Sequence, residues 1–535
     1  MHAAQEVLTS IFTMVLVTDH RKLLHDHNET TNRRKVMKTR NPVITMFIIA
    51  LLSLLSSCTS IVYKQQLVQA QLKAEPRKWL IFLDGTNNDV ASDTNVKRLH
   101  SLVALQNEPR IGTLYVEGVG VDSDVVGMGM GGGFGKRVRL AYEFLLNNYR
   151  NGDKIYIFGF SRGAFEARAL TSMLHYIGLP DAPRPKADSQ ESIVGKLYQE
   201  MKDGFQDSKA TPSIVEAGKS MGLKPRKVAV LGLWDTVEAL GFPQWPRRIA
   251  HKLKIAPLHV DVDEANNRYG DQLLNVEHVL HAVAIDDDRE WIFTPKLVTR
   301  CHLLKPKELQ ASTATPWACD ATGAKPDIHE VFFSGAHSDV GGGYADSDLS
   351  GVSLNWMITM LTRIDREEDK KPLSTNKSSM PRILPNSTQV REDPFGTSHD
   401  PEGGWWSVLY HKVNRNLAAY ALGEPAASGT KACGADLALS DQLHIPLPAF
   451  RSQLCVHPSV FARRKAMAVK PHENPYLKLV KPGPICVRPK KDALANPPIF
   501  EEFPRPSGTD EASCGQEDAE IIHILEWDKD SGTCR

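Results

Sequence analysis

The amino-acid sequence predicts an α/β fold, in which a mostly parallel sheet carries helices on both faces and a less regular carboxy-terminal region caps it. Short, continuous apolar runs occur at residues 79–83, 113–116, 155–158, 228–233 and 331–334. Such runs are typical of parallel strands buried on both faces. Helical patterns separate them, as at residues 138–149 and 164–177. This alternation predicts a doubly wound sheet. After about residue 360 the hydrophobic pattern becomes less regular.

The composition excludes several classes of function. Hydrophobic residues make up 41% of the 535 residues, and 64 basic residues nearly balance 63 acidic ones. A net charge of +1 gives no field that would recruit nucleic acid, so none is expected as a partner. No CxxC pair marks a zinc site, and the glycine-rich stretch 127–135 lacks the spacing of a phosphate-binding loop. We therefore predict neither a metal nor a cofactor.

One motif lies in the structural context that nucleophilic catalysis requires. The run 155–158 continues into Gly159-Phe160-Ser161-Arg162-Gly163 and then directly into the predicted helix. A G-x-S-x-G sequence between strand and helix is the nucleophile elbow of α/β-hydrolase-like sheets, which presents the serine at the carboxyl end of the strand. We predict that Ser161 is the nucleophile. The alternative is a glycine-rich turn whose serine only caps the helix.

A serine nucleophile requires a base, and the base requires an acid that orients it. In this type of sheet the acid and then the histidine follow the serine along the chain, each after a strand. Asp235 follows the run 228–233, and His337 follows the run 331–334. We predict Asp235 as the acid and His337 as the base. The alternatives are a helix N-cap for Asp235 and, for His337, a turn histidine held by Asp339.

Four other residues compete for these roles. His281 lies on an apolar stretch and is more typical of a hydrogen-bonded core histidine. His399 and His457 lie in the less regular region and rank lower. Asp339 either orients the base or binds the backbone of its own glycine turn.

The loop after the first predicted strand is expected to complete an oxyanion hole. The backbone N–H of Gly85 or Thr86 would act beside that of Arg162, while Asp84 accepts the donors of its own loop. The alternative of a phosphatase with an aspartate nucleophile requires a second acid at the position that Thr86 occupies.

The amino-terminal region resembles an export signal. Residues 43–55 are almost wholly apolar, too short to span a membrane comfortably, and are preceded by Lys38 and Arg40. Leu55-Ser56-Ser57-Cys58 resembles a bacterial lipobox, so Cys58 is the predicted site of lipidation. The alternative is a short signal anchor that stays uncleaved. The residue after Cys58 is Thr59 and not the aspartate that would retain a lipoprotein in the inner membrane. We therefore expect the protein at the outer membrane, facing the periplasm.

These signals divide the chain into five expected parts. Residues 1–36 are expected to be untranslated or disordered, with translation starting at Met37. The others are a lipoprotein signal at 37–58, a tether at 59–76, an α/β-hydrolase catalytic domain at 77–362 and an irregular region at 363–535. Among the remaining cysteines, Cys301/Cys319 and Cys514/Cys534 are near in sequence and are candidates for pairing in an oxidising compartment.

Five ordered motifs resemble the DUF2235 family, which includes the Tle1-type phospholipase effectors of type VI secretion. They are FLDGTNND, GFSRGAFEAR, LWDTV, HAVAIDDDRE and FFSGAHSDVGGGY, between about residues 78 and 360. The resemblance implies an α/β-hydrolase fold and Ser-Asp-His catalysis on phospholipid acyl esters. By motif, the roles fall on Ser161, Asp235 and His337. A lipoprotein signal departs from the pattern of a delivered effector.

The sequence therefore predicts a serine esterase of lipids, with a phospholipase A-type activity and a membrane anchor. One alternative is a lipid-anchored binding protein on an inactive hydrolase scaffold. Another is an esterase that acts on a substrate other than phospholipid.

Overall fold

A computed structural model describes most of the chain from residue 62 onward. The described residues are 62–67, 75, 77–85, 93–118, 133–184, 190–206, 211–237, 273, 275–289, 293, 295–298, 327–370, 380–401, 414–422, 453–475, 479–489, 500–503, 514 and 520–535. The predicted lipidation site Cys58 and the oxyanion candidate Thr86 lie outside these ranges. Among the helices in these ranges, none is long and apolar enough to cross a membrane.

Six parallel strands form the centre of the sheet and confirm the predicted α/β class. Their order is β3-β2-β4-β5-β6-β7. The strands are β2 (Lys78–Leu83), β3 (Ile111–Val116), β4 (Lys154–Phe160), β5 (Val228–Trp234), β6 (Val276–Ala284) and β7 (Asp327–Phe333). Five coincide with the predicted apolar runs. The sixth, β6, had been considered only as an apolar stretch around His281.

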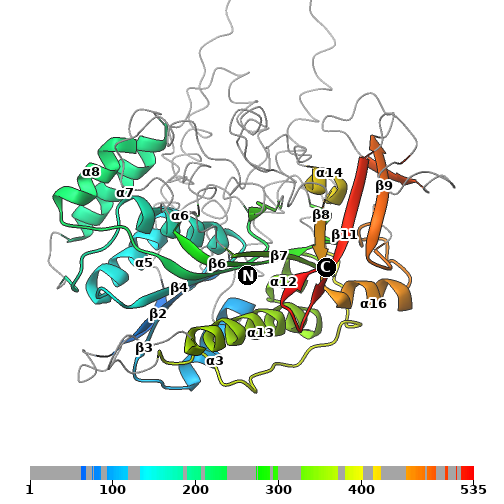
Figure 1. Cartoon of the computed structure of the whole chain (residues 1–535), viewed down its shortest axis with the longest axis horizontal. Helices are drawn as coiled ribbons and strands as arrows, with labels where there is room; N and C mark the ends of the chain where they lie inside the picture. Colours follow the sequence, from blue (N-terminus) through cyan, green and yellow to red (C-terminus); the bar gives the residue numbers. More distant parts are fainter. Residues whose placement is uncertain are drawn as a thin grey trace, which may run out of the picture. The chain divides into compact units, whose positions relative to one another are not determined.

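Helices cover both faces of this sheet (Figure 1). On one face lie α5 (Phe134–Asn148), α6 (Arg162–Tyr176), α7 (Gln190–Gln206) and α8 (Thr211–Ser220), and α5, α6 and α7 share a buried apolar core with the strands. On the other lie α3 (Asn95–Leu105) and α13 (Asp348–Lys370), which bury a second core. Each strand is therefore enclosed by apolar side chains on both sides, which explains its uninterrupted hydrophobic sequence.

The strand order places a topological switch point between β2 and β4. The chain runs from β2 outward to β3 and then returns to the other side of β2 for β4, where Leu83 pairs with Gly159. Open α/β sheets bind ligands in the crevice at the carboxyl ends of the strands beside such a reversal. Ser161 and the Asp84 loop follow β4 and β2 at this point.

The predicted tether contains a strand. Residues of β1 (Tyr63–Gln66) pair antiparallel with β3, with Tyr63 opposite Val116. A strand therefore lies within residues 59–76, the range expected to be a tether. Because β1 runs antiparallel, its first residue lies at the carboxyl edge of the parallel strands.

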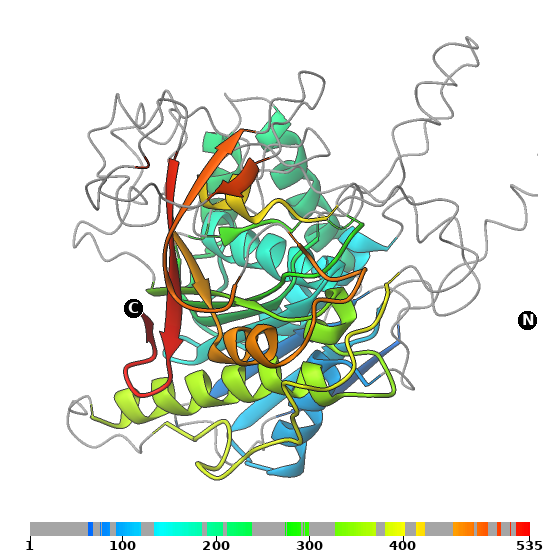
Figure 2. The same cartoon turned by 90° about the vertical axis from the view of Figure 1, so that its right-hand side faces the viewer.

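The carboxy-terminal region is more regular than the sequence predicts (Figure 2). Helix α13 continues past the expected boundary at residue 362, and β8 (Gln453–Val456) extends the parallel sheet beside β7. The next strands are β11 (Glu520–Asp528), β9 (Gly483–Pro489) and β10 (Phe500–Phe503), and β12 (Thr533–Cys534) pairs with β11. Of these strands, β8, β10 and β12 have at most four residues, and β9 contains Gly483, Pro484 and Pro489, which explains why no clear periodicity marks them.

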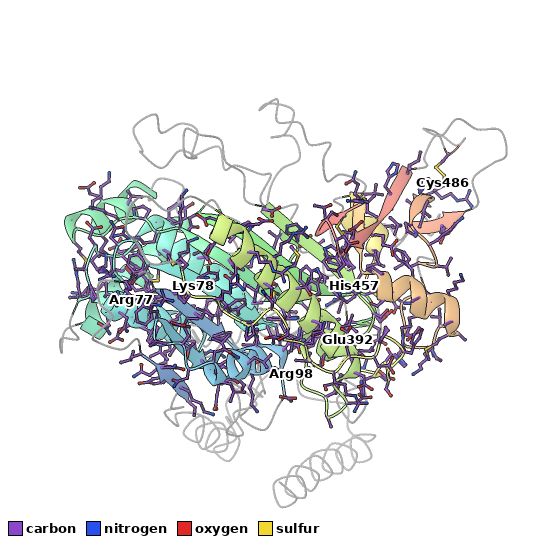
Figure 3. The ribbon with its side chains drawn as sticks, turned by 60° about the horizontal axis from the view of Figure 1, so that its bottom comes forward. Arg77, Lys78, Arg98, Glu392, His457 and Cys486 are labelled. Carbon is purple, nitrogen blue, oxygen red and sulfur yellow. A yellow bond between two sulfur atoms is a disulfide. The ribbon has the colours of Figure 1, made fainter. Side chains whose placement is uncertain are left out.

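The disulfides of this region settle a connectivity that the sequence leaves open. Cys455 bonds to Cys534, and Cys486 bonds to Cys514, so the candidate pair Cys514/Cys534 does not form. The first bond joins β8 to β12, and the second fastens β9 (Figure 3). Distance along the sequence does not predict this pairing, because β8 and β12 are brought together by β11, with which both strands pair. Cys301 and Cys319 lie outside the described residues.

Candidate active site

Ser161 lies on a strained bend between β4 and α6. Its backbone has φ 56° and ψ −124°, dihedral angles that residues other than glycine rarely adopt. Close packing explains the flanking glycines. A Cβ on Gly159 would lie 2.4 Å from the carbonyl oxygen of Gly163, and one on Gly163 would lie 2.2 Å from that of Leu83. The bend is therefore held between two neighbouring backbones.

His337 and Asp235 meet at the same edge of the sheet. His337 is the first residue of the short helix α12 (His337–Gly341), and its Nδ1 lies 2.6 Å from Asp235 Oδ2. The ring of Phe160, the residue before Ser161, packs against the imidazole at 4.6 Å between centroids. The three residues proposed from the motifs thus come from the loops after β4, β5 and β7, at the same edge of the sheet. Their catalytic roles stay predictions.

Asp235 shares two features with Ser161. It follows its strand directly and has a positive φ, 38°, in a non-glycine residue. Its amide donates to the carbonyl oxygen of Ala282 at 2.7 Å, and its Oδ1 accepts the amide of Ala284 at 2.9 Å. Backbone bonds to β6 therefore fix both the main chain and the carboxylate of Asp235.

Carboxylates support the loop that carries His337. The amide of Gly335 donates to Asp286 at 2.6 Å, that of Ala336 to Asp339 at 3.0 Å and that of His337 to Asp287 at 3.1 Å. Asp339 therefore binds the backbone of its own turn, which was one of its two expected roles. Its other oxygen lies 2.6 Å from His399 Nδ1, not against the imidazole of His337.

Charge and burial set the protonation states of the pair. Burial alone would raise the pKa of Asp235, but Arg415 and the hydrogen bond from His337 outweigh it and hold the pKa below its ordinary value. Burial lowers the pKa of His337, which Asp235 only partly offsets. At neutral pH the pair is a carboxylate and a neutral imidazole, the state in which a histidine can accept a proton.

The expected oxyanion loop contains an internal hydrogen bond. The amide of Gly85 donates to Asp84 Oδ1 at 2.7 Å, while Oδ2 accepts the hydroxyls of Thr94 and Tyr115, each at 2.7 Å. Asp84 thus holds its loop as expected. The Gly85 amide, however, is engaged by that carboxylate in this structure. The amide of Arg162, the first residue of α6, stays the other predicted donor.

A buried ion pair lies behind this loop. Arg137 donates to the carbonyl oxygen of Asp84 at 2.8 Å and lies 3.1 Å from Glu166. Burial raises the pKa of Asp84 to about 6 and that of Glu166 to about 7. Because Glu166 is only partly ionised at neutral pH, the Arg137 guanidinium balances much of the negative charge of the two carboxyls.

Arg415 is the site residue that sequence reasoning missed. Its Nη1 donates to Asp235 Oδ1 at 2.7 Å and its Nη2 to Oδ2 at 2.8 Å, in a bidentate pair of two fully buried side chains. The residue lies just before α14 (Leu417–Leu422), 180 positions from its partner. Neither a motif nor a periodic pattern surrounds it, so the sequence carries no signal for it.

Two of the histidines considered as alternative bases, His281 and His457, have structural partners. His281 is fully buried, with Nδ1 2.8 Å from Glu330 and Nε2 3.1 Å from the Thr236 hydroxyl. His457 stacks between Phe333 and Trp527 and caps α16 (Pro458–Ala466) (Figure 3). Across the described ranges, no group of three His, Cys, Asp or Glu side chains is arranged to hold a metal ion.

A serine elbow and a His–Asp pair at the carboxyl edge of a doubly wound sheet define an α/β-hydrolase-like protein. Residues 77–360 match the family model described as "T6SS, Phospholipase effector Tle1-like, catalytic domain". The chain belongs to this family, which confirms the resemblance of the five motifs and supports a hydrolase of lipid esters.

Individual relatives are more distant. An uncharacterised protein of Saccharomyces cerevisiae is 28% identical over 213 residues, which cover 37% of this chain and 28% of that protein. An uncharacterised Pseudomonas aeruginosa protein of known structure is 20% identical, with a TM-score of 0.29, over 53% of this chain and 45% of that one. The chain therefore spans less than half the length of either.

Solved esterases are also similar at low identity. A propionate-bound esterase from Thermogutta terrifontis is 13% identical, with a TM-score of 0.29, over 58% of this chain and 91% of its own. An acyl-protein thioesterase from Zea mays is 10% identical, with a TM-score of 0.22, over 56% and 97% of the two chains.

Proposed function

We propose that this protein is a serine hydrolase that cleaves carboxylic esters of lipids, with a phospholipase A-type activity. The observation that carries the proposal is the 2.6 Å contact between His337 and Asp235 beside the Ser161 elbow. The family match to phospholipase effectors supports a phospholipid as the substrate. Ser161, His337 and Asp235 are the catalytic residues in this proposal.

The proposed reaction is acyl transfer in two steps. His337 Nε2 takes the proton of Ser161 as Oγ attacks the ester carbonyl, and the same proton then passes to the departing alcohol as the ester bond breaks. Asp235, bound to Nδ1, stabilises the imidazolium between the two transfers. Water, deprotonated by His337, next attacks the acyl-serine. The fatty acid leaves, and the proton returns to Ser161.

The oxyanion of each tetrahedral intermediate requires preorganised donors. The amide of Arg162 at the start of α6 is one, supported by the positive end of the helix. The amide of Gly85 becomes the second when a substrate oxyanion replaces the Asp84 carboxylate as its acceptor. Asp84, whose pKa is raised to about 6, is still mostly ionised at neutral pH, so the substrate oxyanion has to displace a carboxylate oxygen from the Gly85 amide. Thr86 is the alternative second donor.

We further propose that the protein is exported and anchored in the cell envelope through Cys58. Two disulfides in the carboxy-terminal region support an oxidising compartment such as the periplasm. A lipidated Cys58 would tether the protein to the membrane that contains its proposed substrate.

Lipid product analysis tests the activity. The protein is incubated with phospholipid vesicles whose two acyl chains differ in mass, and the released fatty acids and lysolipids identify the bond cleaved. Ser161→Ala should abolish release, whereas Ser101→Ala, on the exposed side of α3, should retain it. Full hydrolysis by the Ser161→Ala protein would contradict the mechanism. Absence of hydrolysis by the wild-type protein on phospholipids and simple esters alike would favour an inactive scaffold.

Lipidation has a separate test. Mass spectrometry of the envelope-extracted protein should give a diacylglyceryl-modified Cys58 as the first residue, and Cys58→Ser should release the protein from the membrane. An unmodified Cys58, or a peptide from residues 1–36, would contradict this part of the proposal and leave the chemistry untouched.

A further inference from the structure

Arg415 and Asp235 form a fully buried, bidentate ion pair beside His337. Both side chains are fully buried, and the guanidinium meets both carboxylate oxygens. Burying two charges is costly, and such a pair often stabilises a fold no better than apolar side chains would. A pair at this position, on the acid that binds His337, therefore points to a role in the site.

Asp235 Oδ2 is shared between two donors. It lies 2.6 Å from His337 Nδ1 and accepts Arg415 Nη2 at 2.8 Å, while Oδ1 accepts Arg415 Nη1 and the Ala284 amide. Four donors thus surround the carboxylate in a fixed arrangement. The planar guanidinium sets the plane of the carboxylate, which directs Oδ2 toward the imidazole.

The same guanidinium holds the surroundings of the imidazole. Arg415 Nη2 donates to the carbonyl oxygen of Phe293 at 2.6 Å, and the Phe293 ring packs against His337 at 4.9 Å between centroids. Arg415 Nη1 donates to the carbonyl oxygen of Ala284 at 2.6 Å, at the end of β6. Asn474 in turn binds the Arg415 carbonyl at 2.6 Å. One side chain therefore connects the acid, the wall beside the base and the carboxy-terminal region.

We propose that Arg415 is a positioning residue of the active site, which orients the Asp235 carboxylate toward His337 and balances its charge. This rests on the proposed function. It also means that the site is incomplete without the carboxy-terminal region, because Arg415 lies outside the family match at residues 77–360.

Charge balance has a measurable consequence for the base. A carboxylate paired with a cation stabilises a neighbouring imidazolium less than a lone carboxylate does. The other charged groups that act on His337 are Asp287 and Arg289, which pair with each other at 2.6 Å. Removing the charge of Arg415 should therefore favour the imidazolium and move the acidic limb of the rate profile to higher pH.

Two variants separate charge from geometry. Arg415→Met removes both, and should lower kcat on a soluble short-chain ester by about 10²-fold, leave KM nearly unchanged and shift the acidic limb upward. Arg415→Lys keeps the charge but loses the bidentate geometry, so kcat should fall while the acidic limb stays near its wild-type position. Guanidinium at millimolar concentration should partly restore the Met variant.

A buried ion pair far from the site provides the control. Lys78, at the start of β2 (Figure 3), lies 2.6 Å from Asp365, and both are buried. Lys78→Met should destabilise the fold in the same way but leave kcat per folded molecule and the acidic limb unchanged.

The outcomes distinguish the two proposals. If folded Arg415→Met and Arg415→Lys proteins keep wild-type kcat and pH profile, Arg415 has no positioning role, although Ser161 chemistry would stand. If the Met variant does not fold, the Lys variant decides the question by the same readouts. A wild-type protein without a serine-dependent activity would overturn the proposed function instead.

Discussion

The two halves of this molecule encode the site in different ways. Residues 77–360 carry the serine elbow and the proposed acid and base in short motifs that follow β4, β5 and β7. The region after residue 380 contributes the single side chains of Arg415 and Asn474, from irregular segments, and of Arg464, from α16. Chemistry that depends on local backbone geometry is therefore visible in the sequence. Chemistry that depends on long-range packing is not.

Arg464 illustrates the second kind of contribution. It donates to Asp286 Oδ1 at 2.5 Å, and the other oxygen of Asp286 accepts the Gly335 amide, two residues before the predicted base. The backbone amide of Asn474 donates to the same Asp286 oxygen at 3.0 Å. The carboxy-terminal region thus supports the His337 loop as well as Asp235, and it is more than a cap.

The largest expected effect comes from the motif half. Asp235→Asn should lower kcat by about 10⁴-fold, as expected when a triad histidine loses its orienting carboxylate. The variant also leaves Arg415 without its anionic partner, so circular dichroism must establish that the protein is folded. A folded variant with wild-type kcat would remove Asp235 from the mechanism and weaken the contrast between the halves.

A smaller loss is expected from the close packing at the elbow. In Gly163→Ala the new Cβ would lie 2.2 Å from the Leu83 carbonyl oxygen, so the helix must move away from β2. We expect kcat to fall by about 10²-fold and the free energy of unfolding to fall by about 1–3 kcal/mol. Gly195→Ala, in α7 with no atom within 4 Å of its Cβ, is the control. It should stabilise the protein by at most about 1 kcal/mol. Equal behaviour of the two variants would contradict the packing argument.

In the carboxy-terminal half, the disulfides should matter for stability in a defined order. Cys455–Cys534 encloses 79 residues and Cys486–Cys514 encloses 28. Restriction of the unfolded chain then gives upper estimates of about 4.5 and about 3.6 kcal/mol. Serine replacement of the first pair should therefore lower the denaturation midpoint more than replacement of the second. The reverse order in chemical denaturation would show that local structure outweighs loop length.

The smallest expected effect is the pH dependence of the wild-type protein. Since burial lowers the pKa of His337, its charging opposes folding: this contribution to stability is complete above the ordinary pKa of 6.5 and is lost as pH falls toward the folded pKa. The depressed pKa of Asp235 acts in the same direction at lower pH, because stability is lost as pH falls below 3.8 toward the folded value. Denaturation across pH should follow this course, and kcat/KM should have an acidic midpoint below 6.5. A midpoint above 6.5 would contradict the assignment of the base.

Much of the fold was predictable, because a parallel strand that is covered on both faces of the sheet needs an apolar residue at nearly every position. Such strands therefore appear in the sequence as continuous apolar runs. The elbow at Ser161 was predictable for a related reason, since glycines must flank a bend that is pressed against β2. The pairing of Asp235 with His337 followed from their positions after strands. Arg415 could not be found, because a single arginine in an irregular segment has no local constraint.

Two further features escaped prediction for physical reasons. The strand β1 lies in a polar segment, since an edge strand that is largely exposed needs little hydrophobic sequence. The sequence suggested the Gly85 amide as an oxyanion donor, but in the structure this amide donates to the carboxylate of Asp84, one residue earlier. Both depend on neighbours that only the folded chain defines.

Covalent labelling with a fluorophosphonate tests the central claim most directly, because this probe reacts with a serine only when a base activates it. Peptide mapping of the labelled wild-type protein should place one adduct on Ser161, with labelling abolished in Ser161→Ala and strongly slowed in His337→Ala. A folded wild-type protein that does not react, or an adduct on a different serine, would contradict the account.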